Sequence, residues 1–454
     1  MAEQTVRQLF GTDGIRGVAG EPPLDERTAF ALGVALGGWI VSKGKDERGR
    51  AVLIGMDTRE SGLWLAEEVA GGLARASVDT RFAGVITTPG VAYLTRTGPF
   101  AAGVMISASH NPFHDNGLKV ISHSGYKLAD EVELELERAV NEWLARNEPT
   151  RPKALTSDPS LDNLYTDYLA STVEGTFPFR LVIDCANGSA AAIAPPLFAR
   201  FGKEVDWMGV SPNGRNINLD CGSLHLHGLQ QRVRESGADF GIAFDGDADR
   251  ALFVADSGRV VDGDAVLFLT GSALKRKGKL AQNTVVATVM SNLGLQKALE
   301  RQGIAMLRTP VGDKYVLEEM LRRGAVLGGE QSGHVIFSEY ATTGDGLLTA
   351  LRVMEVVRES QRTLDELAAD ITNFPQKLVN VRVKQKRPLA DLASVQAEIR
   401  AAEDAFNGSG RVVVRFSGTE PLARVMIEAG TDEEVDLWTT RIADAIRAEL
   451  GTAG

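Results

Sequence analysis

The hydrophobic and polar positions along the chain repeat one pattern: a short apolar run, a small polar turn, then apolar residues at helical spacing. It occurs at residues 51–76 (AVLIGMDTRESGLWLAEEVAGGLARA), 180–202 (RLVIDCANGSAAAIAPPLFARFG) and 284–307 (TVVATVMSNLGLQKALERQGIAML). A strand followed by an amphipathic helix is the repeating unit of α/β folds. The pattern therefore predicts three α/β units, with polar turns at strand ends, where open α/β sheets commonly bind ligands.

The pattern changes towards the C-terminus. After residue 373, the alternating stretch LVNVRVKQ predicts a strand, and a helix, RVVVRFSGTEPLARVMIEAG and a last helix follow, which is typical of a small α+β domain. Residues 145–162 are rich in proline and charge and lack periodicity, which indicates a domain boundary. The predicted domains are 1–155, 156–258, 259–372 and 373–454.

The composition of the chain limits the kinds of molecule that the protein is expected to bind. The 454 residues are 44% hydrophobic and 24% charged, as in a multi-domain globular protein, and the net charge of −11 argues against nucleic-acid or anionic-membrane partners. Two cysteines, Cys185 and Cys221, exclude a disulfide framework and a four-cysteine zinc site. The N-terminus lacks the features of a secretory signal, so a cytoplasmic location is expected. The apolar run at 29–41 is too short to span a bilayer and is predicted to be a buried helix.

The segment SASHNP (107–112) follows the apolar run AAGVMI and places Ser109 where a buried strand ends. A serine hydroxyl there can act as a nucleophile, and the alternative is a polar Asn-Pro turn. A Ser-His-Asp hydrolase is disfavoured because the G-x-S-x-G elbow is absent. His110 is also expected to point away from Ser109, since neighbours on an extended chain face opposite sides.

The segment FDGDADR (244–250) carries three carboxylates at alternate positions, Asp245, Asp247 and Asp249. They can converge on one hard cation if the backbone curls around it. An EF-hand is excluded because its sixth loop position is Arg250 rather than glycine, and the flanking segments are strand-like. The sequence predicts a magnesium site, with phosphate oxygen as a further ligand.

Two further segments carry polar groups suited to a phosphorylated sugar. GGEQSGH (328–334) offers a carboxylate, an amide, a hydroxyl and an imidazole on a glycine-rich loop. RFSGTEPLAR (415–424) combines a Ser-Gly-Thr core with two arginines, which suits a phosphate. The alternative for the second segment is a tight turn between two strands.

Together with FGTDGIRG (10–17), these motifs follow the order found in the α-D-phosphohexomutase family, which the chain resembles over nearly its whole length. GEQSGH, where many members have GEMSGH, is similar to the branch that acts on glucosamine phosphates. The resemblance implies three related mixed α/β domains and a C-terminal α+β domain resembling the TATA-binding-protein fold. The active cleft would lie where the four domains meet.

The resemblance also implies a reaction. Glucosamine 6-phosphate and glucosamine 1-phosphate would be interconverted through a phosphoserine at Ser109 and a sugar 1,6-bisphosphate, which also acts as primer, to supply UDP-N-acetylglucosamine synthesis. Mg²⁺ would be held by the phosphorylated Ser109 with Asp245, Asp247 and Asp249. The implied partner is a phosphorylated hexosamine, without nucleic acid or membrane, and the family is compatible with a homodimer.

Individual roles follow from the same resemblance. Arg16 and Arg250 would lie beside the phosphoserine. His110 and Lys119 are candidates for proton transfer, and which acts in which direction stays open. As a base, Lys119 would need a lowered pKa, and phosphate binding is an equal alternative for it. Substrate-binding roles are implied for Glu330, Ser332, His334, Arg415, Ser417, Gly418, Thr419 and Arg424, and further candidates in TPVGDKYV are Gly312, Asp313 and Lys314.

Other functions fit the same residues. A phosphomannomutase or phosphoglucomutase is an alternative because Gln331 alone favours an amino sugar over glucose or mannose. From a different class, a magnesium-dependent phosphatase or a catalytically inactive sugar-phosphate-binding protein would also use these motifs.

Overall fold

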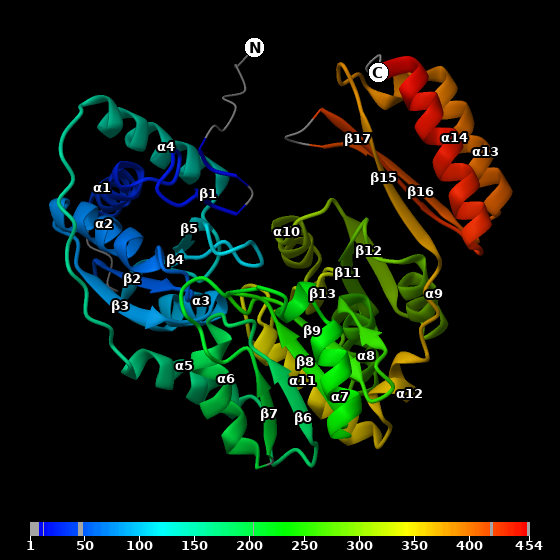
Figure 1. Ribbon diagram of the computed structural model, residues 1–454, viewed down its shortest axis with the longest axis horizontal. Helices are drawn as coiled ribbons and strands as arrows, with labels where there is room; N and C mark the ends of the chain where they lie inside the picture. The colour runs from blue at the N-terminus through cyan, green and yellow to red at the C-terminus, as the bar shows by residue number, and fades with distance from the viewer. Residues whose placement is uncertain (1–8, 12, 44–48, 203, 418–420, 452–454) are drawn as a thin grey trace.

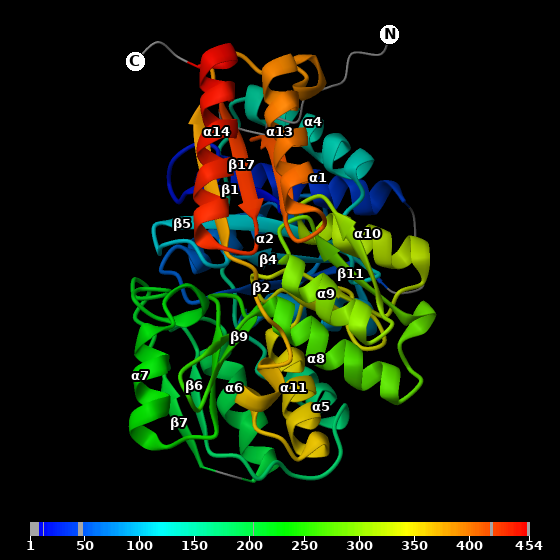
Figure 2. The same ribbon diagram turned by 90° about the vertical axis from the view of Figure 1, so that its right-hand side faces the viewer.

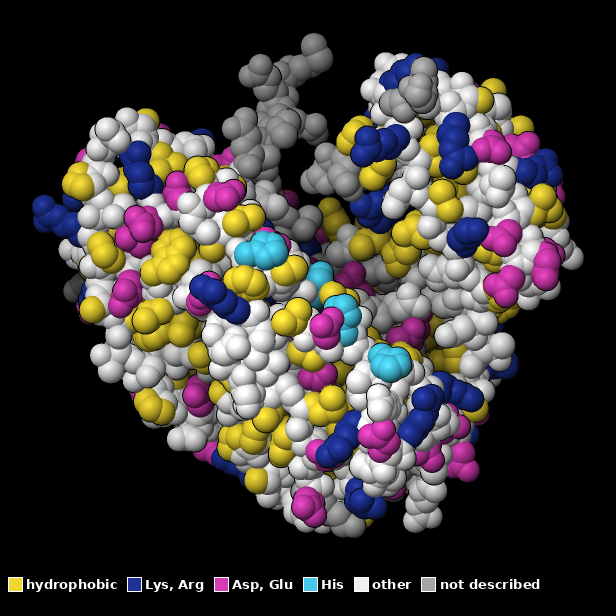
Figure 3. Space-filling model, viewed as in Figure 1, with side chains coloured by type: hydrophobic (Ala, Val, Ile, Leu, Met, Phe, Trp, Pro, Cys, Tyr) yellow, Lys and Arg dark blue, Asp and Glu magenta, His cyan; other side chains and the backbone are white. Residues whose placement is uncertain are grey.

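The computed structural model describes residues 9–11, 13–43, 49–202, 204–417 and 421–451. These residues form four units, each built on its own sheet, which we call domains I to IV (Figure 1). Figure 3 shows that the surface is hollowed between the parts of the molecule formed by domains I and IV.

Domain I contains a five-stranded sheet of order β1-β5-β4-β2-β3. Strands β2, β3 and β4 are parallel, whereas β5 runs antiparallel to β4 and to β1. Helix α1 includes the run at 29–41, so the predicted buried helix is confirmed. The elements are β1 (Ile15–Val18), α1 (Glu26–Ser42), β2 (Ala51–Met56), α2 (Gly62–Arg75), β3 (Thr80–Val85), α3 (Thr88–Thr97), β4 (Phe100–Ile106), β5 (Asp115–Ser122) and α4 (Asp130–Ala145).

Domain II repeats this arrangement with the order β10-β9-β8-β6-β7. Strands β6, β7 and β8 are parallel, and β9 is antiparallel to β8. The elements are α5 (Ser160–Ser171), β6 (Leu181–Asp184), α6 (Ala190–Phe198), β7 (Val205–Met208), α7 (His227–Ser236), β8 (Phe240–Phe244), β9 (Ala251–Ala255) and β10 (Val260–Val261).

Domain III has four strands in the order β12-β11-β13-β14, with β14 antiparallel to β13 and the other pairs parallel. The three strand-turn-helix units predicted from the sequence are thus confirmed as β2–α2, β6–α6 and β11–α9. The elements are α8 (Gly263–Arg276), β11 (Thr284–Thr288), α9 (Leu293–Arg301), β12 (Ala305–Thr309), α10 (Asp313–Arg323), β13 (Leu327–Gly329), β14 (Val335–Phe337), α11 (Gly346–Ser360) and α12 (Leu364–Ala368).

Domain IV is a three-stranded antiparallel sheet, order β15-β17-β16, with two helices on one face, which matches the predicted α+β class (Figures 1 and 2). Its core contains only its own residues, whereas one large apolar cluster includes side chains of domains I, II and III. Domains I to III therefore share packing that domain IV does not. The elements are β15 (Gln376–Arg382), α13 (Ala393–Phe406), β16 (Arg411–Phe416), β17 (Leu422–Glu428) and α14 (Asp432–Leu450).

Among the described residues, no helix combines the length and the apolar character that crossing a membrane requires.

Candidate active site

Three of the predicted motifs occupy the same place in three related sheets. Residues 107–114 connect β4 to β5, residues 245–250 connect β8 to β9, and residues 330–334 connect β13 to β14. Each connection joins a strand of the parallel set to its antiparallel neighbour. The motifs therefore lie in connections between adjacent strands, as the strand-like flanks of 244–250 indicated. The strand-to-helix turn after β2 carries a supporting residue, Arg59.

Ser109 lies at the meeting point of domains I and II. Its Oγ donates a 2.5 Å hydrogen bond to Oδ2 of Asp245, and it is only 2% exposed. The Ser109 backbone has φ of +53°, a left-handed conformation that is uncommon for a residue other than glycine. This conformation brings Nδ1 of His110 to 3.3 Å from Ser109 Oγ. The expectation that His110 points away is wrong because the chain is not extended at Ser109.

Arg59 holds the Ser109 loop from inside domain I, a role that the sequence analysis missed. Its guanidinium donates hydrogen bonds to the carbonyl oxygens of Ser109 and Asn111 at 3.0 and 2.8 Å, and also to those of Pro112 and Asp115. Its side chain is fully buried and pairs with that of Asp57 at 2.9 Å. A buried guanidinium that satisfies several carbonyls fixes a loop in one conformation.

Asn218 holds the same loop from domain II. Its Nδ2 donates to the carbonyl oxygens of Ser109 and Asn111 at 2.9 and 3.1 Å. Gly246 lies against the loop as well: a Cβ at this position would be 2.5 Å from the carbonyl oxygen of Ser109. The glycine of DGDADR is therefore required by close approach of the two loops.

The three aspartates of the β8–β9 connection converge as predicted. Asp245, Asp247 and Asp249 are buried, and each offers a carboxylate oxygen within 4.8 Å of the others. Burial, followed by the charges of Asp249 and Asp247, raises the pKa of Asp245 well above its ordinary value. Among the described residues, Oδ1 of Asp247 and Oδ1 of Asp249 are buried without a hydrogen-bond partner. Buried, unpartnered carboxylate oxygens in such a cluster fit a hard divalent cation such as Mg²⁺.

Lys119, on β5, is buried next to this cluster. Its Nζ lies 2.8 Å from Oδ2 of Asp247 and 3.0 Å from Oδ2 of Asp13. Burial lowers the pKa of Lys119, but the carboxylates of Asp13, Asp247 and Asp249 outweigh it and raise the pKa above its ordinary value. The lowered pKa that a lysine base requires is not found, so the geometry favours a permanently charged Lys119.

Arg16 and Arg250 carry positive charge near this centre. Arg16 pairs with Asp13, and Nε of Arg250 lies 3.7 Å from Oδ1 of Asp249. Burial, followed by the charges of Arg250 and Arg16, lowers the pKa of His110 to about 4. His110 is therefore neutral near pH 7 and able to accept a proton.

The β13–β14 connection contains Glu330, Ser332 and His334. Oε1 of Glu330 accepts a 3.1 Å hydrogen bond from the backbone N–H of Gly312, and the buried Oγ of Ser332 has no hydrogen-bond partner in the described part of the chain. Nδ1 of His334 lies 3.5 Å from Oδ2 of Asp249, and its Nε2 accepts from the N–H of Gly344 at 3.0 Å. Both ring nitrogens of His334 are thus engaged by the protein, and the connection adjoins the aspartate cluster.

Arg415 and Arg424 lie directly opposite each other on β16 and β17. Like charges in this position are unfavourable without an anion between or beside them. Burial and the charge of Arg424 lower the pKa of Arg415. Lys386, which sequence reasoning missed, donates to the carbonyl oxygen of Ser417 at 2.6 Å. The predicted residues Gly418 and Thr419 lie outside the described part of the chain.

The further candidates of TPVGDKYV begin helix α10. Gly312 contacts Glu330 as described, and Oδ2 of Asp313 lies 3.8 Å from Nε2 of His334. Lys314 pairs with Asp130 of domain I. Gly312 and Asp313 thus adjoin the β13–β14 connection, whereas Lys314 reaches away from it.

Family models match all four domains. They describe "Phosphoglucomutase/phosphomannomutase, alpha/beta/alpha" domain I at residues 7–147, domain II at 161–258 and domain III at 262–374. A fourth, for the C-terminal domain of the same family, matches residues 378–445.

Two similar proteins align with nearly the whole length of this chain. The phosphoglucosamine mutase of Solibacter usitatus is 59% identical over 452 residues, which are 98% of this chain and 99% of that protein. The phosphoglucosamine mutase of Koribacter versatilis is 52% identical over 459 residues, 99% of this chain and 98% of that protein.

Solved structures share the fold. A phosphoglucomutase/phosphomannomutase family protein from Burkholderia thailandensis superposes with a TM-score of 0.78 at 24% identity, covering 97% of this chain and 99% of that one. Aspergillus fumigatus N-acetylphosphoglucosamine mutase in complex with GlcNAc-6P and magnesium superposes with a TM-score of 0.65 at 20% identity. The superposition covers 99% of this chain and 97% of that one.

Proposed function

Because the chain belongs to the phosphoglucomutase/phosphomannomutase family, we propose that it interconverts glucosamine 6-phosphate and glucosamine 1-phosphate. Two full-length relatives named phosphoglucosamine mutase, at 59% and 52% identity, support this substrate. The observation that carries the chemistry is the hydroxyl of Ser109 against Asp245 in a buried cluster of three aspartates. A serine at this point can carry a phosphoryl group between two positions of one sugar.

Two transfers make up the reaction. Phosphorylated Ser109 gives its phosphoryl group to the free hydroxyl of the sugar phosphate: the Oγ–P bond breaks, a sugar O–P bond forms, and the proton of the sugar hydroxyl is replaced by one taken up at Ser109 Oγ. The resulting 1,6-bisphosphate turns round, and its other phosphoryl group passes to Ser109 Oγ: the other sugar O–P bond breaks, a new Oγ–P bond forms, Oγ loses its proton, and the sugar oxygen takes one up. Such transfers depend mainly on positioning and charge stabilisation.

Asp245, Asp247 and Asp249 would hold Mg²⁺ with an oxygen of phosphorylated Ser109. When bound, the ion supplies positive charge that offsets the carboxylates and the transferred phosphoryl group. A sugar 1,6-bisphosphate would act as primer by phosphorylating Ser109 in a resting enzyme.

His110 is the residue we propose for the proton at Ser109. Its pKa of about 4 leaves the imidazole neutral near pH 7, and its Nδ1 is 3.3 Å from Oγ, so it can accept the serine proton when the phosphoryl group returns. Lys119, Arg16 and Arg250 would contribute fixed positive charge along the path of the phosphoryl group.

Substrate recognition is assigned to domains III and IV. Glu330 and Ser332 would bind sugar hydroxyls, and His334 would orient Asp249 as well as border the sugar. Arg415, Ser417, Gly418, Thr419 and Arg424 would bind the phosphate that is not being transferred. The opposed arginines on β16 and β17 support this assignment because two guanidinium groups on facing strands can both donate hydrogen bonds to one phosphate.

Substrate comparison and intact mass test the proposal. Glucosamine 1-phosphate should be turned over at a higher kcat/KM than glucose or mannose 1-phosphate, each assayed with its own bisphosphate and Mg²⁺. The purified protein should carry phosphate on Ser109 in part, and Ser109→Ala should carry none and be inactive. Better use of mannose or glucose 1-phosphate would replace the substrate. Net release of inorganic phosphate would indicate a phosphatase, and absence of both phosphate and turnover a binding protein.

A further inference from the structure

Lys127 joins domain I to domain III beside the candidate active site. It lies between β5 and α4, and its Nζ is 2.7 Å from Oδ1 of Asp13 and 2.6 Å from Oδ2 of Asp313. Asp13 belongs to the N-terminal loop of domain I, and Asp313 is the first residue of α10 in domain III. One ammonium group therefore binds carboxylates of two domains, and no motif of the sequence analysis includes it.

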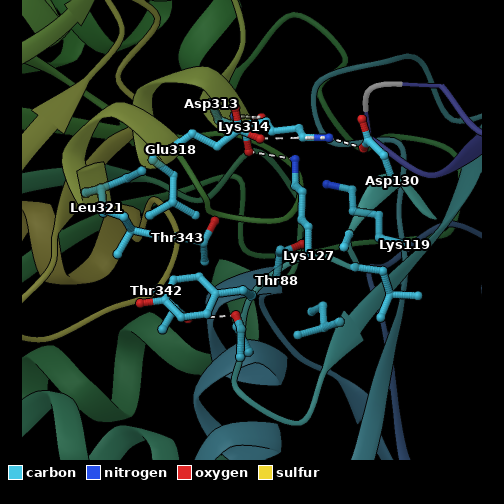
Figure 4. A pocket seen from close by; sticks show the side chains of 18 of the residues that line it. Thr88, Lys119, Lys127, Asp130, Asp313, Lys314, Glu318, Leu321, Thr342 and Thr343 are labelled. Carbon is cyan, nitrogen blue, oxygen red and sulfur yellow. Dashed lines mark hydrogen bonds and ion pairs between the residues drawn. The ribbon is translucent and has the colours of Figure 1, made fainter. Parts of the chain in front are cut away.

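The bridge crosses a cavity rather than a packed interface. A cavity of about 350 Å³ separates domain I from α10, with Lys127 and Asp313 among its lining residues. Figure 4 shows both side chains reaching across it, with Lys314 and Asp130 forming a second ion pair at its rim. Domains I and III share apolar packing elsewhere, but at this cavity their side chains do not interlock, so the position of the start of α10 depends there on such polar ties.

Both ends of the bridge lead to candidate active-site residues. At one end, Asp13 also binds Arg16 and, at 3.0 Å, Lys119. At the other, Asp313 follows Gly312, whose N–H donates the 3.1 Å hydrogen bond to Oε1 of Glu330. The bridge thus connects the charged groups near Ser109 with the element that orients Glu330.

We propose that Lys127 is a positioning residue, which sets the distance between the Ser109 side of the site and Glu330 by binding Asp13 and Asp313 together. This inference rests on the proposed function, in which Glu330 binds the sugar. Loss of the bridge lets the start of α10 move relative to domain I. Glu330 is then displaced, and its binding to the sugar hydroxyls is weakened. The hydrogen bonds that hold Ser109 itself involve Arg59, Asp245 and Asn218 of domains I and II, and they do not include the bridge.

The test compares Lys127→Met with Lys127→Arg, which keeps the charge and can bind two carboxylates, and with Asp130→Asn as matched control. The control removes the other ion pair across the same cavity. Steady-state kinetics with glucosamine 1-phosphate and hydrogen exchange of the backbone amides at 312–316 are measured on the full chain. If Lys127→Met does not fold, Lys127→Gln replaces it.

Lys127→Met should raise KM about tenfold, change kcat less than about threefold, and increase amide exchange at 312–316 about tenfold. Lys127→Arg should have the KM and the amide exchange rate of the wild type, and Asp130→Asn should change neither. A fall in kcat at constant KM, or exchange equal to that of the wild type, would overturn the proposal. If the wild type turns over none of the sugar phosphates, the proposed function fails, and hydrogen exchange alone decides whether Lys127 restrains α10.

Discussion

The Oγ of Ser109 lies 2.5 Å from Oδ2 of Asp245, although 136 positions separate the two residues in the sequence. The two side chains come from the equivalent connections of domains I and II, so the nucleophile and the acidic cluster meet only when both domains are assembled. Turnover therefore depends on how firmly the two connections are held against each other. Groups that hold the two connections together should affect turnover more than groups that hold either domain alone.

Asp245→Asn should abolish the stabilisation by Mg²⁺ without weakening the fold itself. The isosteric amide can accept from the N–H of Arg250 and donate to Ser109 Oγ, so both existing hydrogen bonds have replacements. The substitution removes a carboxyl group whose ionisation is opposed by burial and then by the charges of Asp249 and Asp247, which together raise its pKa. Without Mg²⁺, the free energy of unfolding should rise by about 1 kcal/mol. Added Mg²⁺ should stabilise the wild type but not the variant, and activity should be lost.

Urea unfolding with EDTA and with saturating Mg²⁺ measures both effects. A variant that is less stable than the wild type in EDTA, or that Mg²⁺ still stabilises, would contradict the assignment of Asp245.

Asn218→Ala should reduce turnover more than stability. The variant loses the two hydrogen bonds from domain II to the Ser109 loop, but Arg59 still donates to the same two carbonyl oxygens, so neither is left unpaired. We expect kcat to fall about tenfold, with a stability loss of about 1 kcal/mol. Asn213→Ala, an exposed position in the same segment, is the control and should be neutral. Equal kcat in both variants would show that Asn218 does not position the Ser109 loop for catalysis.

Asp345, at the start of α11, predicts a pH dependence of stability. It caps α11 by accepting from the N–H of Leu348 at 2.9 Å, and it accepts from the hydroxyl of Tyr165 at 2.7 Å. Burial outweighs these hydrogen bonds and raises its pKa from 3.8 to about 6. A raised pKa means that the folded protein binds the proton more tightly than the unfolded chain. The contribution to stability is therefore complete below about pH 4 and is lost as pH rises through 6.

The measurement compares the wild type with Asp345→Asn, which keeps the shape but does not titrate. Between pH 4.5 and 7.5, the free energy of unfolding of the wild type should fall by about 2 kcal/mol relative to the variant. Parallel pH profiles would show that Asp345 is ionised throughout this range.

Sequence reasoning identified the units and the motifs because both are local. Periodicity over about ten residues predicts a strand or helix, and residues 245–249 are close in space because they are close in the chain. It did not identify Asp13, Arg59 or Asn218, because their partners lie on other elements or other domains. The DTRESG turn was noted at a strand end, but nothing local indicates that Arg59 binds carbonyls more than 50 positions away.

The orientation of His110 was mispredicted for a related reason. An extended chain was assumed at a residue whose backbone is left-handed, and tertiary contacts impose that conformation.

Gln331 supplies the last prediction, because the sequence analysis took it as the sign of an amino-sugar substrate. Its Nε2 donates to Oδ2 of Asp262 at 3.2 Å, and its backbone carbonyl oxygen accepts from the N–H of Gly263 at 3.0 Å. Gln331 therefore ties the β13–β14 connection to the start of α8, where Asp262 also caps the helix through Ala265. Gln331→Met should lower kcat/KM for glucosamine, glucose and mannose 1-phosphates by similar factors, and Asp262→Asn, which still offers a hydrogen-bond partner, should do so less. A change of more than about tenfold in the preference for glucosamine would instead mean that Gln331 contacts the amino group.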